Sequence, residues 1–128
     1  MSTILVTQDE QPLVAVVCAV PLVYEALRDV LGQVARVQFF PASRGTAGLL
    51  QWVQPDVVIV DDEAEVEDAS TFARERDLPL VHVSLRERQV RVLSKGVWLQ
   101  ESNGDGSGPT PETVRDIVAG SLYGRRHP

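Results

Sequence analysis

The chain of 128 residues contains one cysteine, few aromatic residues and no excess of basic charge. Because the single Cys18 cannot form an internal disulfide, we expect a protein of a reducing compartment, the cytoplasm. Aromatic residues make up 5% of the sequence, and the formal net charge is −6. Both values argue against direct binding of nucleic acid, which needs a basic face or aromatic side chains that stack on bases.

Long hydrophobic runs are also missing. The longest apolar stretch, residues 13–23, is interrupted by Pro21 and is far shorter than the roughly 20 residues that a membrane-spanning helix needs. No basic segment precedes it, so the sequence predicts neither a membrane span nor a signal peptide. The chain is 44% hydrophobic and 23% charged, and it is long enough for one domain with a hydrophobic core.

The hydrophobic residues follow two alternating patterns. Short runs rich in β-branched residues predict buried strands, and apolar residues at helical spacing predict helices between them. The expected strands are 13–18, 35–40, 57–60, 80–84 and 97–100, and the expected helices are 21–32, 45–54, 63–77 and 110–122. Strands that alternate with helices predict a parallel sheet covered by helices on both faces.

Residues 85–95 allow two interpretations. They fit a helix that ends at Gly96, or a hairpin in which residues 90–93 and 97–100 pair around residues 94–96. We favour the helix, because parallel strands need a crossover of about a dozen residues between them.

The first strand also has two candidates, residues 4–7 and residues 13–18. The earlier segment belongs to ILVTQDEQPLV, in which a strand-like run is followed by the acidic residues Asp9 and Glu10. Against it, the β-branched residues that follow run into Pro21 and would make a poor helix. We therefore favour residues 13–18, and residues 1–12 are then an N-terminal arm or an extra edge strand.

Residues 13–124 resemble the receiver domain of bacterial response regulators. VPLVYEALRDVLG is similar to the first receiver helix, PDVVIVD to the third strand, LPLVHVS to the fourth strand and KGVWLQES to the fifth strand. The resemblance implies an α/β, flavodoxin-like, doubly wound sheet of five parallel strands in the order 2-1-3-4-5. It also implies a role in bacterial two-component signal transduction, with residues 125–128 as a tail.

The resemblance assigns roles to residues at the strand ends. It places Asp61 at the phosphoacceptor position, Ser84 at the hydroxyl position and Glu101 at the position of a lysine that holds the phosphoryl group. Phosphorylation of a receiver also requires Mg²⁺ bound by an acidic pair after the first strand. Here Cys18 and Ala19 occupy those positions and are not Mg²⁺ ligands, and an anion stands where a cation is needed. We therefore expect a degenerate receiver that is not an enzyme and uses no cofactor.

The alternative is a functional receiver. In this interpretation Asp61 accepts the phosphoryl group, and Mg²⁺ is bound with the help of Asp9 or Asp62. It requires the segment that contains Asp9 to lie beside the strand that ends at Asp61.

A receiver that is not phosphorylated would act by binding a protein partner or by forming a homodimer. In receivers the fourth helix, the fifth strand and the fifth helix form the contact surface. The matching interaction face here comprises Val90, Trp98, Leu99, Val114 and Leu122, with Trp98 as its anchor. A further polar residue, His82, lies within an apolar strand, so we expect a buried structural histidine.

Overall fold

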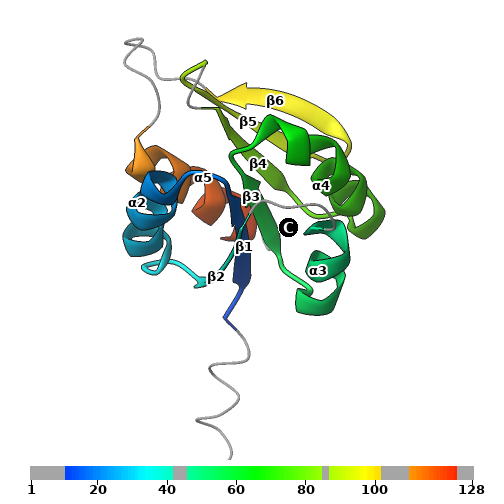
Figure 1. The fold of residues 1–128 in the computed structure, drawn as a ribbon, viewed down its shortest axis with the longest axis horizontal. Helices are drawn as coiled ribbons and strands as arrows, with labels where there is room; N and C mark the ends of the chain where they lie inside the picture. Colours follow the sequence, from blue (N-terminus) through cyan, green and yellow to red (C-terminus); the bar gives the residue numbers. More distant parts are fainter. Residues whose placement is uncertain (1–10, 42–45, 85–86, 102–109, 124–128) are drawn as a thin grey trace, which may run out of the picture.

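The computed structural model describes residues 11–41, 46–84, 87–101 and 110–123, in which strands and helices alternate up to β4 (Figure 1). The proposed arm at 1–12 therefore lies almost entirely outside the described residues, as does the tail at 125–128. The elements are β1 (Leu13–Cys18), α2 (Pro21–Leu31), β2 (Arg36–Pro41), α3 (Thr46–Val53), β3 (Val57–Val60), α4 (Glu63–Arg76), β4 (Leu80–Ser84), β5 (Gln89–Ser94), β6 (Val97–Glu101) and α5 (Pro111–Tyr123).

The strands form one mixed sheet in the order β2-β1-β3-β4-β5-β6. The first four strands of this order pair in parallel, which confirms the predicted order 2-1-3-4 and the choice of Leu13–Cys18 as the first strand. The prediction of five parallel strands is wrong, because β5 and β6 pair antiparallel. The predicted fifth strand is β6, and it occupies the outermost position instead of a place beside β4.

The predicted helix at 85–95 is wrong, and the hairpin alternative is correct. β5 alternates inward apolar and outward polar residues, with Val90 buried and Arg91 half-buried, as a strand with unequal faces does. Lys95 and Gly96 both have positive φ angles, 53° and 79°. Two such residues form the type I′ turn that matches the twist of a hairpin. The chain between β4 and β5 is too short for a helical crossover, so the strands must run antiparallel.

This turn gives a test with a matched control. Gly96→Ala is expected to lower the free energy of unfolding by about 1 kcal/mol, because an added Cβ is unfavourable at positive φ. Gly120→Ala in α5 is expected to raise it by about 1 kcal/mol, because alanine favours helix. Neither added Cβ would meet an atom within 4 Å, so backbone conformation alone separates the two sites. Urea unfolding measures both changes in the free energy of unfolding. Changes of the same sign would contradict the assignment of Lys95 and Gly96 to a type I′ turn.

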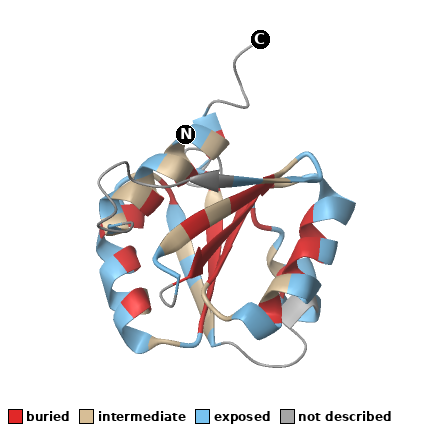
Figure 2. Ribbon diagram, turned by 90° about the horizontal axis from the view of Figure 1, so that it is seen from above, coloured by how far each residue is buried: buried red, intermediate tan, exposed pale blue. Residues whose placement is uncertain are grey.

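The sheet lies between two helical layers. α2 and α5 cover one face, and α3 and α4 cover the other (Figure 1). The central strands β1, β3 and β4 are buried on both faces (Figure 2), which explains their nearly continuous β-branched sequences. Burial of these strands supplies the main hydrophobic stabilisation of the fold. The carboxyl ends of the four parallel strands meet at one edge of the sheet, where the candidate site lies.

Candidate functional site

Asp61 follows β3 directly and joins the carboxyl ends of β1 and β3. One oxygen of its carboxylate accepts a hydrogen bond from the backbone N–H of Ala19 at 2.7 Å, and the other accepts one from Val20 at 3.1 Å. The backbone N–H of Asp61 donates to the carbonyl oxygen of Val17 at 3.3 Å. Hydrogen bonds to a carboxylate are stronger than those between neutral groups. Asp61 therefore holds the turn between β1 and α2 in place.

The start of α2 explains why this turn needs a partner from another strand. Val20 occupies the N-cap position in an extended conformation, and its side chain has no oxygen that could cap the helix. Pro21 follows at the first helical position, where its missing N–H is harmless. The Asp61 carboxylate also places a negative charge near the positive end of the helix. Its contacts are those of a structural cap.

The residues opposite Asp61 do not suit a divalent cation. Burial, and after it the negative charge of Asp61, raises the pKa of the Cys18 thiol to about 12. Cys18 is therefore a neutral thiol at physiological pH and a poor ligand, while the side chain of Ala19 has no ligand atom. Within the described ranges, no three histidine, cysteine or acidic side chains lie close enough together to bind a metal ion. Asp9, the ligand of the alternative interpretation, lies outside those ranges.

The other polar residues at this edge also have local structural roles. Asp62 is the N-cap of α4, and its carboxylate accepts a hydrogen bond from the backbone N–H of Ala64 at 3.0 Å. The hydroxyl of Ser84 is buried and accepts one from the backbone N–H of Glu87 at 3.2 Å. Ser84 thus ends the strand beside β3, as the resemblance implied. For Glu101, the structure describes the backbone alone, at the end of β6.

A row of interacting side chains, of which His82 is buried and Arg91 and Trp98 are half-buried, crosses β4, β5 and β6. His82 is 1% exposed, and its Nδ1 lies 2.9 Å from Nη2 of Arg91 on β5. Since arginine only donates hydrogen bonds, Nδ1 accepts and the ring proton is on Nε2. The Arg91 guanidinium lies over the Trp98 ring, 4.9 Å from its centre. Burial, followed by the charge of Arg91, lowers the pKa of His82. The histidine is therefore neutral in the folded protein.

The sequence predicted a buried histidine here but not its arginine partner. The partnership depends on the antiparallel register of β4 and β5, in which His82 lies opposite Arg91. An interpretation of residues 85–95 as a helix could not bring these two residues together. The alternation of apolar and polar residues in QVRVLS was the signal for a strand.

The structure divides the predicted interaction face. Val90, Val114 and Leu122 lie together inside the core, between the sheet and α5. Leu99 is 52% exposed on β6, and Trp98 is half-buried. Trp98 packs against the core cluster on the opposite face of the sheet, under α4. Of the five residues, those on β6 are therefore the ones that a partner could reach.

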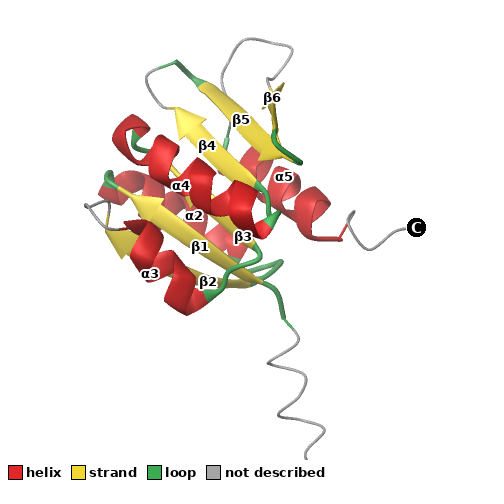
Figure 3. Ribbon diagram, turned by 90° about the vertical axis from the view of Figure 1, so that its right-hand side faces the viewer, coloured by secondary structure: helices red, strands yellow, loops and turns green. Residues whose placement is uncertain are grey.

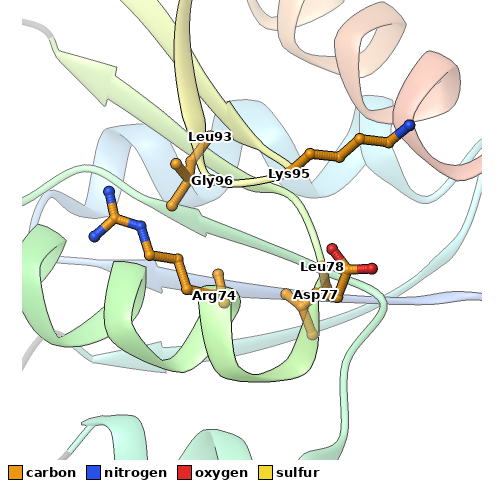
Figure 4. A pocket seen from close by; sticks show the side chains of 7 residues that line it. Arg74, Asp77, Leu78, Leu93, Lys95 and Gly96 are labelled. Carbon is orange, nitrogen blue, oxygen red and sulfur yellow. The ribbon is translucent and has the colours of Figure 1, made fainter.

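Two pockets indent the described surface. One of about 600 Å³ lies at the carboxyl ends of β1 and β2, where the Tyr24 and Phe39 rings approach to 3.8 Å. One of about 390 Å³ lies between the end of α4 and the β5–β6 turn (Figure 4). The charged ends of Arg74 and Lys95 point in different directions there, so they do not converge on an anion (Figure 4). Neither lining identifies a ligand by its polar groups.

Among the helices that the structure describes, none has the length and apolarity to cross a membrane. No protein-family model matches the sequence, and the searches of curated proteins and of solved structures returned no similar protein. The geometry at the strand ends is therefore the basis for the functional inference.

Proposed function

We propose that this chain is a receiver-like signalling module that binds a protein partner without phosphorylation of Asp61. The observation that supports it best is the pair of hydrogen bonds from Ala19 and Val20 to the Asp61 carboxylate. A phosphoacceptor oxygen must be accessible to the phosphoryl donor, whereas both oxygens here accept hydrogen bonds from the backbone. Phosphorylation would neutralise the charge of one oxygen and weaken the contacts that hold the β1–α2 turn.

The electrostatics support the same proposal. Transfer of a phosphoryl group to a carboxylate requires a cation that neutralises the charge that accumulates. The side chains of Cys18 and Ala19 supply no oxygen ligand for Mg²⁺, and the adjacent Asp62 caps α4. The module would keep the receiver-like part of its sheet because the hydrophobic core and the backbone hydrogen bonds to Asp61 stabilise the fold without Mg²⁺.

Incubation of the protein with Mg²⁺ and acetyl phosphate, followed by intact-mass spectrometry, tests this proposal. We expect no phosphoryl adduct, and we expect Mg²⁺ with beryllofluoride to leave the amide NMR spectrum around residues 17–20 and 61 unchanged. A phosphorylatable receiver treated in parallel shows that the reagents are active.

An adduct that forms on the wild-type chain but not on Asp61→Asn would refute the proposal and establish the phosphoacceptor alternative. Asp62→Asn is the matched control, because it removes the same charge from the neighbouring residue. An adduct that persists in both variants would lie at another residue and would leave Asp61 unmodified, as proposed.

A further inference from the structure

β6 is the outer strand of the sheet, and no described residue pairs with its outer edge (Figure 3). We propose that two copies of this chain associate by pairing their β6 strands antiparallel, so that two six-stranded sheets become one continuous sheet. This inference rests on the proposed function, because it names a second copy of the chain as a partner of the module.

The side chains of β6 support an interface. Val97 is 58% exposed and Leu99 is 52% exposed. They share a face with Val90 and Val92, which are buried between β5 and α5. The apolar face of the sheet therefore continues beyond its helical cover at β6. An exposed apolar edge strand of this kind is a template for another strand.

The opposite edge of the sheet is built differently. In β2 the exposed side chains are Arg36, Gln38 and Pro41, two of them polar. Pro41 also has no N–H with which to pair. Proline and charged residues are devices that discourage pairing of edge strands. β2 has these devices, whereas the β6 side chains described as exposed, Val97 and Leu99, are apolar. The contrast selects β6 as the edge for association.

The backbone of the hairpin fixes which groups of β6 are free. A two-residue turn is closed by a hydrogen-bonded pair, here Ser94 and Val97. Because hydrogen-bonded and non-hydrogen-bonded pairs alternate in an antiparallel ladder, Val97 and Leu99 direct their N–H and C=O groups toward β5. Trp98 and Gln100 direct theirs toward the free edge, as does the C=O group of Gly96, which shares a peptide with the inward N–H of Val97.

One register of two β6 strands pairs outward backbone groups and also covers the exposed apolar side chains. If Trp98 lies on the twofold axis, it pairs with Trp98 of the second copy, and the N–H of Gln100 donates to the C=O of Gly96. The outward N–H groups of Trp98 and Gln100 then find acceptors. The same register places Val97 opposite Leu99 of the second copy, so the exposed apolar residues cover each other.

Sedimentation equilibrium of the full chain over a dilution series tests the association. We expect a species of twice the 14.0 kDa chain mass that dissociates on dilution. Leu99→Lys is expected to weaken the dimer at least about tenfold, because the lysine would face apolar Val97 of the second copy. Leu22→Lys is the matched control, since Leu22 is 76% exposed on α2 and away from β6. A single-chain mass throughout, or equal dimers in both variants, would overturn the proposal.

A second variant tests the backbone pairing. Gln100→Pro removes an N–H that points to the free edge, so it leaves the β5–β6 ladder intact. We expect this variant to fold, as judged by circular dichroism, and to be monomeric. A dimer that survives Gln100→Pro at full strength would exclude pairing through β6.

Cross-linking tests the register. Residues 97 and 99 of the two copies form non-hydrogen-bonded pairs, whose Cα separation of about 4.5 Å suits a disulfide. We expect an oxidised dimer when Val97→Cys and Leu99→Cys proteins are mixed, and none from either alone. The native Cys18 is buried, and burial raises its pKa to about 12, so it will not compete. Cross-linking of Leu99→Cys alone would overturn this register. None of these readouts depends on phosphorylation, so the dimer and the proposed function can fail separately.

Discussion

Asp61→Ala is expected to lower the free energy of unfolding by about 3 kcal/mol, which is a large part of the stability of a domain this size. Its carboxylate accepts two backbone hydrogen bonds, and each charge-assisted bond contributes about 1.5 kcal/mol or more. The variant leaves the N–H groups of Ala19 and Val20 without their acceptor. Urea unfolding followed by circular dichroism measures the loss.

Two further variants separate this role from a general effect of charge. Asp62→Ala removes the neighbouring carboxylate, which accepts one bond as the N-cap of α4, and it should cost about 1 kcal/mol. Asp61→Asn keeps one carbonyl oxygen as an acceptor, so its stability should lie between those of wild type and Asp61→Ala. If Asp61→Ala costs no more than Asp62→Ala, the carboxylate does not hold the turn.

Arg91→Leu is expected to destabilise the fold by about 3 kcal/mol. It removes the donor to Nδ1 of buried His82 and the cation over the Trp98 ring. Arg28→Leu is the matched control, because Arg28 also lies over an aromatic ring, Tyr24, but its side chain is 58% exposed and its ion pair with Asp29 is long. That change should cost no more than about 0.5 kcal/mol.

A double variant tests whether the buried hydrogen bond is the cause. In His82→Leu/Arg91→Leu both polar partners are gone, so no buried acceptor is left without a donor. We expect this protein to be more stable than Arg91→Leu by at least about 1 kcal/mol. A double variant less stable than Arg91→Leu would show that the guanidinium acts through another contact.

The same pair predicts how stability depends on pH. The groups that face His82 are Arg91 on β5 and the carboxylates Asp61, Glu63 and Glu87, and burial is the largest cause of its lowered pKa. Below pH of about 6.5 the unfolded chain binds a proton that the folded imidazole resists. Stability is therefore lost as the pH falls through this range, by up to about 1.4 kcal/mol per unit. His82→Leu should lack this part of the pH dependence. If the free energies of unfolding of His82→Leu and wild type changed equally with pH, this prediction would be wrong.

The parallel half of the fold could be predicted from the sequence, because its signals are local and strong. The buried strands are continuous β-branched runs, and α2 is marked by Pro21 at its start and Gly32 after its end. These features predicted the strands and helices, and the resemblance to receiver domains implied the order of the first four strands. The prediction for residues 85–95 was wrong because this short, charged segment has weak periodicity. It was assigned as a helix from a rule for parallel sheets. The turn residues Lys95 and Gly96 carried the local evidence for the hairpin.

The site could be predicted only in part, for a different physical reason. The sequence placed Asp61 at the end of a central strand and Cys18 with Ala19 across from it, and the structure brings these residues together. The sequence could not indicate that the Asp61 carboxylate accepts hydrogen bonds from the backbone of Ala19 and Val20. That contact arises because Val20 cannot cap its own helix, and the capping group comes from a residue about forty positions away.

The connectivity of the sheet has a consequence for how the chain folds. β4, β5 and β6 follow one another in sequence and pair with their sequence neighbours, whereas β1 pairs with β2 and β3 across intervening helices. Contacts between residues close in sequence form faster, because less chain entropy is lost in closing them. We therefore expect the 80–101 meander to gain protection from amide exchange before the parallel strands do. During that interval the outer edge of the meander is accessible while the core is incomplete, so refolding at high concentration should favour association between chains.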